Sequence, residues 1–183
     1  MTPREALLTR AIGWFAENGV GDTSLRTLAG ALGTSHRMLI YHFGSREGLL
    51  GAVVEAVERA ERDALAELMG AHEDPYAAGA AFWAHVCAAR VFVPLFFELS
   101  GLAMQGRDWG ASLRRWLADG WTAPMAAGYR AQGHPAARAE ALARLSVAAA
   151  RGLLFELAVT GDRAAADAAM AELTAMVRAA QPA

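Results

Sequence analysis

The sequence is poor in several residue types, and each shortage excludes a class of protein. One cysteine, Cys87, occurs among 183 residues, which excludes an internal disulfide and a metal site made of several cysteines. Lysine is absent, so the 17 basic residues are all arginine. Proline occurs only six times, and β-branched residues are sparse while alanine is abundant. This balance favours helices over sheets, and we expect an all-α protein.

Long apolar runs are missing too. The most apolar stretch, residues 91–97, is interrupted by Pro94 and is far shorter than the roughly 20 residues that cross a bilayer. The N-terminal residues MTPREALLTRA mix acidic and basic side chains and do not resemble a signal peptide. We therefore expect a cytoplasmic protein that does not enter a membrane. The net charge of −2 does not by itself indicate a nucleic-acid binder, although residues 1–50 carry +1 and the remainder −3.

Apolar residues recur at helical spacing along most of the chain. A first helix is expected over residues 3–17, because Asn18-Gly19 can end it. Two short helices should follow, and Ser45 can cap a long helix that reaches residue 69. Gly, Pro and Asp residues then separate five further expected helices, over residues 75–90, 92–105, 109–132, 135–160 and 163–179.

The two short helices carry the most informative pattern, LRTLAGALGTSHRMLIYHFGSREGLL, over residues 25–50. The first of these short helices shows the apolar spacing i, i+3, i+4, i+7 and ends at Gly33. Ser35 can cap the second short helix. Two helices of about eight residues joined by a short glycine-containing turn form a helix-turn-helix. Leu32, Leu39 and Phe43 should face inward and hold the pair together.

Polar side chains should remain on the outer surface of the second short helix. Arg37 can give a bidentate hydrogen bond to guanine, and Ser35 and His36 can bond base edges or phosphate oxygens. Tyr41 and His42 offer donors to the DNA backbone. Two further arginines are placed near phosphates, Arg26 at the start of the first short helix and Arg46 in the first turn of the long helix.

Over residues 6–50 the sequence resembles the TetR family of transcriptional regulators. The matching residues are Phe15-Ala16-Glu17-Asn18-Gly19, Leu28-Ala29, Leu32-Gly33, Leu39, Tyr41-His42-Phe43, Ser45-Arg46-Glu47 and Leu49. The resemblance implies phosphate contacts by Thr23, Ser24, Tyr41, His42 and Arg46. It places Arg26, Ser35, His36, Arg37 and Met38 nearer the bases. Two positions depart from the family pattern, with Ile40 in place of a frequent tyrosine and Thr34 in place of a common valine.

The same resemblance implies a division into two domains. Residues 1–45 would form the three-helix DNA-binding domain, and residues 46–183 a helical ligand-sensing and dimerisation domain, with residues 46–69 as the connecting helix. The partners implied are double-stranded DNA, a small-molecule effector and a second copy of the chain. Family members usually dimerise through their last two long helices, and two-fold symmetry suits a palindromic operator.

Two apolar stripes in the last two expected helices suit such a dimer. They comprise Leu142, Leu145, Ala149 and Leu153 in one helix, and Met170, Leu173 and Val177 in the other. Each stripe alone is also compatible with packing in the protein's own core. An apolar face this wide on the terminal helix is expected to be buried against other apolar residues. This favours burial against a second copy of the chain in a dimer.

Large apolar side chains of the second domain are candidates for the effector pocket. The main candidates are Trp83, Phe97, Met104, Trp121, Met125 and Phe155; Phe82, Phe96, Trp116 and Tyr129 are further candidates. The side chains that could anchor polar groups are His85, Arg90, Glu98, Arg151 and Glu156. Most such aromatic residues are ordinary core. The hypothesis is a repressor released by a small apolar or aromatic ligand, and action as an activator stays open.

Two other classes of function compete with this interpretation. A helical protein-interaction module would use the first three helices to bind a partner helix, but such a groove needs apolar anchors where residues 35–42 are polar. An enzyme is disfavoured because His85 and Cys87 point about 200° apart on a helix and cannot pair as base and nucleophile. The scattered histidines show no metal-ligand spacing, so we expect no metal and no cofactor.

Overall fold

The computed structural model describes residues 1–21, 23–89, 92–104 and 120–180, and the regular elements in these ranges are all helices. The all-α prediction is thereby confirmed. The helices are α1 (Pro3–Asn18), α2 (Leu25–Ala31), α3 (His36–Phe43), α4 (Arg46–Ala71), α5 (Pro75–Ala88), α6 (Phe92–Met104), α8 (Thr122–Ala131), α9 (Ala136–Thr160) and α10 (Arg163–Ala179).

Side-chain caps begin the first four helices. Thr2 and Glu5 form a reciprocal capping box at the start of α1. Ser24, Ser35 and Ser45 accept hydrogen bonds from backbone N–H groups two or three positions into the helices that follow them, at 3.0–3.2 Å. The capping roles predicted for Ser35 and Ser45 are confirmed.

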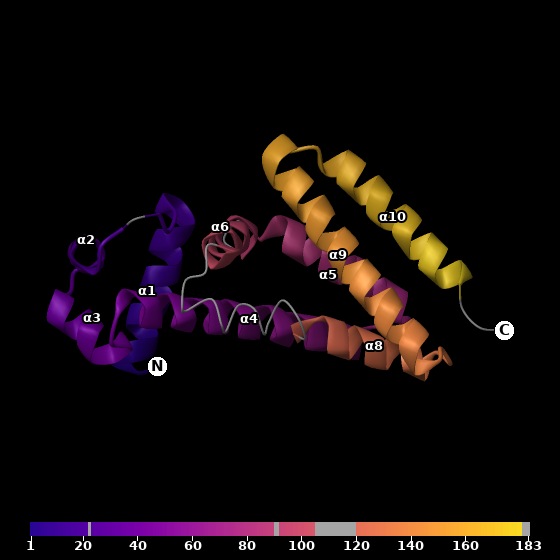
Figure 1. The fold of residues 1–183 in the computed structure, drawn as a ribbon, viewed down its shortest axis with the longest axis horizontal. Helices are drawn as coiled ribbons and strands as arrows, with labels where there is room; N and C mark the ends of the chain where they lie inside the picture. The colour runs from indigo at the N-terminus through magenta and orange to yellow at the C-terminus, as the bar shows by residue number, and fades with distance from the viewer. Residues whose placement is uncertain (22, 90–91, 105–119, 181–183) are drawn as a thin grey trace. The chain divides into compact units, whose positions relative to one another are not determined.

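Contacts divide the chain into two units, Met1–Arg114 and Arg115–Ala183. In the first unit, α1, α2 and α3 gather around the beginning of the long helix α4, and α5 packs along α4 (Figure 1). The core under the short helices is formed by buried apolar residues of α1–α4, including Leu7, Ala11, Phe15, Leu28, Leu39, Phe43, Leu49, Leu50 and Val53. The predicted inward positions of Leu32, Leu39 and Phe43 are confirmed, because each is less than 9% exposed. The division into functional domains that was predicted after residue 45 differs from this boundary between the two contact-defined units, and it stays a proposal.

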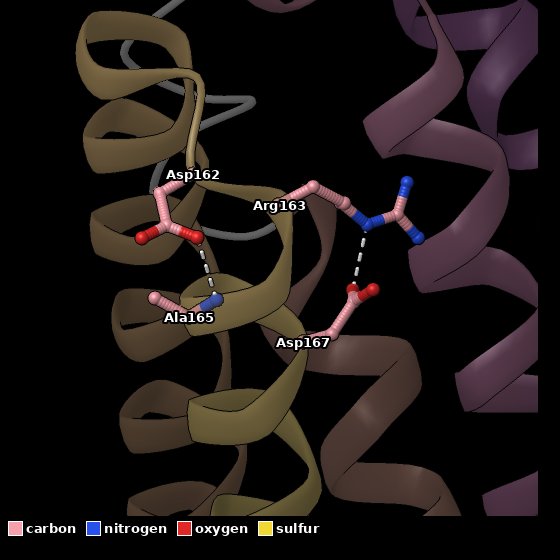
Figure 2. Close-up of polar contacts among 4 residues, drawn as sticks. All are labelled: Asp162, Arg163, Ala165 and Asp167. Carbon is pink, nitrogen blue, oxygen red and sulfur yellow. Dashed lines mark hydrogen bonds and ion pairs between the residues drawn. The ribbon is translucent and has the colours of Figure 1, made fainter.

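The second unit consists of a helical hairpin and a shorter helix. α9 and α10 run antiparallel and side by side, and α8 packs against α9 (Figure 1). Gly161, in the left-handed conformation, ends α9. Asp162 then caps α10 by accepting from the Ala165 N–H at 3.0 Å, and Arg163 pairs with Asp167 one turn later at 2.7 Å (Figure 2).

One predicted helix is interrupted at Trp121. The sequence pattern predicted a continuous helix over residues 109–132, whereas in the described part Trp121 forms a turn and α8 begins at Thr122. Proline has no N–H and its ring clashes with the carbonyl four residues earlier, so Pro124 fits the first turn of a helix but not its interior. The beginning of the predicted range lies outside the described residues.

Among the described residues no single helix has the length and apolarity needed to cross a bilayer. α5 and the Phe92–Gly101 part of α6 meet these criteria only as a pair bent by 78°.

Candidate nucleic-acid interface

The outer face of α3 is almost entirely exposed, while its inner face is buried. Ser35, His36, Arg37 and Tyr41 are exposed, and Tyr41 reaches 78% exposure. The apolar side chains of Met38 and Ile40 are each 39% exposed on the same short helix. Leu39 is fully buried and Phe43 nearly so, which fixes the helix to the core by one side. The structure therefore presents Ser35, His36, Arg37 and Met38, four of the five residues predicted to lie near the bases, together at the start of α3, while Arg26 lies on α2.

The five arginines of the first 50 residues differ in what their guanidinium groups do. Arg4 donates to the His42 carbonyl at 3.3 Å and lies over the Phe43 ring, so it braces the end of α3. Arg10 donates to the Leu32 carbonyl at 2.7 Å, where α2 ends. Sequence reasoning gave neither of these two arginines a role, because their acceptors are 38 and 22 residues away.

Arg26 and Arg37 behave differently. Both side chains are exposed and neither has a hydrogen bond or ion pair with any described residue. Arg26 lies in the first turn of α2 and Arg37 in the first turn of α3. These are the two guanidinium groups of the helix-turn-helix that are available to an external acceptor such as a guanine edge or a phosphate.

Arg46, a predicted phosphate contact, is half-buried and braces the loop between α1 and α2. Its guanidinium donates to the Thr23 carbonyl at 2.9 Å and also to the carbonyls of Val20 and Gly21. Thr23 and Ser24, two further predicted phosphate contacts, follow in the same loop, and the Ser24 hydroxyl also caps α2. His42 is half-buried between the rings of Tyr41 and Phe43.

Residues 7–53 match the family model for bacterial regulatory proteins of the tetR family. This match covers the whole helix-turn-helix and the beginning of α4. The helix-turn-helix region of the chain is therefore of the TetR-family type. The resemblance seen in the sequence is confirmed, and with it the interpretation of the N-terminal helices as a DNA-binding domain of a transcription regulator.

The TetR-like architecture extends over the whole chain. A transcriptional regulator from Rhodococcus sp. Rha1 has a TM-score of 0.80 at 21% identity, with 96% of this chain and 95% of that chain covered. A TetR-family regulator from a Rhodococcus species gives 0.77 at 19% identity, with 98% of each chain covered. GusR of Salmonella enterica gives 0.73 at 21% identity, with 97% and 98% covered. At these identities the likeness establishes the fold alone. No curated protein sequence matches the chain.

The predicted dimer residues lie on the α9–α10 hairpin, but they differ in exposure. Leu145 is 57% exposed, whereas Val177 is 5% exposed within a single chain. The remaining members, Leu142, Ala149, Leu153, Met170 and Leu173, are half-buried. Val177 is therefore already covered by its own unit, and Leu145 leaves most area for a partner.

The six predicted effector contacts are distributed over both units. Trp83 on α5 is buried and Phe97 on α6 half-buried, while Met104 at the end of α6 is 84% exposed. In the second unit, Trp121 is half-buried, and Met125 and Phe155 are 38% and 55% exposed. Their joint role stays a prediction. Arg90 and Trp116, which the sequence also singled out, lie outside the described residues.

One predicted polar anchor of the first unit, His85, has a buried partner. Its Nε2 lies 3.2 Å from a carboxylate oxygen of Glu61 on α4, and its ring stacks on Phe82. Burial raises the pKa of Glu61, and the neighbouring His85 acts in the opposite direction with a smaller effect. In the second unit, burial lowers the pKa of Arg151, another predicted anchor.

Proposed function

We propose that this TetR-family protein binds a palindromic operator in double-stranded DNA as a homodimer and regulates transcription from it. The observation that carries the proposal is the outer face of α3. Ser35, His36, Arg37 and Tyr41 are exposed there on a helix fixed from behind by Leu39 and Phe43. A short helix with one buried and one polar exposed face is what a major groove accepts.

Within this function the residues take three kinds of role. Arg37 hydrogen-bonds a base edge, assisted by Ser35, His36 and Met38. Arg26, Thr23, Ser24, Tyr41 and His42 contact phosphates or the groove edge and set the register of the helix. Arg46 braces the α1–α2 loop from the first turn of α4, and the N-terminus of that helix itself favours a phosphate.

The homodimer is supported by a continuous exposed stripe on α9. Leu145, Ala148, Gly152, Phe155 and Val159 recur at helical spacing, and all five are exposed. Phe155 and Val159 are 55% and 71% exposed, and Met176 on the neighbouring α10 is 56% exposed. Alanine and glycine among them allow close approach of a second pair of helices. A four-helix interface of this kind would cover apolar side chains that water otherwise surrounds.

The regulatory half of the proposal is a repressor that a small apolar or aromatic ligand releases from DNA. The aromatic residues of α5 and α6 are the candidate apolar lining for this ligand in the first unit, with polar groups such as His85 near them. Release requires the ligand to bind more tightly to the conformation that does not fit the operator. Under this proposal residues 1–45 act on DNA, and residues 46–183 sense the ligand and dimerise.

The first experiment is an electrophoretic mobility shift on the DNA upstream of the protein's own gene. Wild type is compared with Arg37→Ala and with Arg59→Ala as a matched control, because Arg59 is also exposed but lies on α4 away from α3. We expect a discrete shift that Arg37→Ala weakens by about tenfold or more and Arg59→Ala leaves unchanged. An equal loss of operator affinity in both variants would mean that Arg37 contributes only its positive charge and does not read a base. No shift on this DNA or on a genomic pool would contradict the proposal.

A salt titration separates this function from that of a helical protein-interaction module. Binding to duplex DNA releases counterions, so log K should fall linearly with log salt concentration. A protein-interaction module has no such affinity for duplex DNA at moderate salt. Absence of duplex binding under these conditions would therefore favour the interaction module.

A further inference from the structure

We propose that Glu98 is a positioning residue for DNA binding, because it holds the α1–α2 loop in place from helix α6. This inference rests on the DNA-binding function proposed above. Glu98 touches no part of the helix-turn-helix surface that would face DNA. It acts through the loop that precedes the cap of α2.

The contact consists of three hydrogen bonds on one carboxylate. Both carboxylate oxygens accept from the Val20 N–H at 2.8 Å, and Oε1 also accepts from the Gly21 N–H at 2.5 Å. Neither N–H has a backbone acceptor among the described residues. Hydrogen bonds to an ionised carboxylate are about twice as strong as those between neutral groups.

The loop is also held from its other side. Arg46 donates hydrogen bonds to the carbonyls of Val20, Gly21 and Thr23. The C=O groups of the loop are thus bound by Arg46, and the N–H groups of Val20 and Gly21 by Glu98. The Val20 side chain between them is fully buried. Gly19, which leads into the loop, has φ of +75°, a left-handed conformation that side chains disfavour. The two side chains together thus fix the donors and the acceptors of the loop backbone.

This arrangement connects the expected sensing helix directly to the DNA-binding surface. α6 also carries Phe97, a predicted effector contact and the immediate neighbour of Glu98. The loop leads into Thr23, Ser24 and Arg26, which are predicted DNA contacts. A displacement of α6 that breaks the carboxylate contact would release these residues from their register with the phosphates.

The test compares Glu98→Gln and Glu98→Ala with wild type for operator affinity, with Glu55→Gln as the matched control. Glu55 is an exposed acid of the same unit, on α4. Removing a negative charge alone strengthens binding to DNA, and Glu55→Gln should show this small effect. Glu98→Gln should instead weaken binding by about tenfold and Glu98→Ala by more, because hydrogen bonds to a charged acceptor are lost. Affinity equal to that of Glu55→Gln would overturn the proposal.

Amide hydrogen exchange distinguishes positioning from a general loss of stability. In Glu98→Ala the amides of Val20 and Gly21 should exchange at least tenfold faster, while those of α3 stay protected. Loss of protection throughout α1–α3 would show a merely structural role and would contradict the proposal. This measurement needs no DNA. If the wild-type protein bound no operator, the function proposed above would fail, and hydrogen exchange would still decide whether Glu98 holds the loop.

Discussion

Two glycines, one near the end of α2 and one in the turn that follows it, have opposite conformational needs. Gly33 has φ of +60°, a left-handed conformation that side chains disfavour, whereas Gly30 lies inside α2 with no positive φ. A Cβ would meet no atom within 4 Å at either position, so packing does not separate the two. We expect Gly33→Ala to destabilise the fold by about 1 kcal/mol and Gly30→Ala to stabilise it by about 0.5 kcal/mol. Urea denaturation of both variants measures this, and the same sign for both would contradict the argument.

Arg46 poses a question that structure and sequence answer differently. The family resemblance implies a phosphate contact, while the structure gives its guanidinium three carbonyl acceptors in the α1–α2 loop. Arg46→Ala should weaken operator binding in either case. If Arg46 contacts a phosphate, the slope of log K against log salt concentration also falls by about 1, and if it only braces the loop the slope is unchanged. Because the Arg46 guanidinium is already hydrogen-bonded to the loop, we expect Arg46→Ala to weaken operator binding and to leave the slope of log K against log salt concentration unchanged.

At the scale of helices, Arg10 and Arg26 form a pair with separable roles. Arg10 bonds the carbonyl at the end of α2, while Arg26 at its beginning bonds no described residue. Arg10→Ala should therefore lower the free energy of unfolding by about 1 kcal/mol, and Arg26→Ala should leave it within about 0.5 kcal/mol of wild type. Operator affinity should show the reverse order. Arg26→Ala should lose more affinity than Arg10→Ala, because Arg26 is the one expected to contact DNA directly. Thermal denaturation and mobility shifts of the two purified variants test both halves.

The helices themselves were largely predictable from the sequence, because their determinants are local. Apolar spacing and the capping serines placed α2, α3 and the start of α4, and the turn glycine marked the helix-turn-helix. The interruption at Trp121 before α8 was not predicted, since the pattern ignored Pro124. The contacts of Arg4, Arg10 and Glu98 could not be predicted, because their partners lie 22 to 78 residues away and no local pattern encodes them. Glu98 in particular was interpreted as an anchor for a ligand.

At the scale of the whole molecule, the exposed stripe on α9 predicts self-association. Leu145→Asp would bury an unpaired charge in the proposed interface, which costs several kcal/mol. We expect wild type to sediment as a dimer of 19.3 kDa chains and Leu145→Asp to sediment as a monomer with weaker operator binding. Ala127→Asp, which adds the same charge to an exposed position on α8, should remain dimeric. A monomeric wild type at micromolar concentration would exclude the proposed homodimer.

The two side chains that hold the α1–α2 loop have a consequence for protein engineering and for evolution by domain exchange. A chimaera that joins residues 1–71 to the sensing half of another regulator retains Arg46 but loses Glu98. Such a hybrid keeps every side chain that is proposed to contact DNA and still lacks the acceptor for two of the loop's N–H groups. The portable unit therefore extends at least to α6, and hybrids cut earlier should regain operator affinity when the foreign helix is given an acidic residue at the corresponding position.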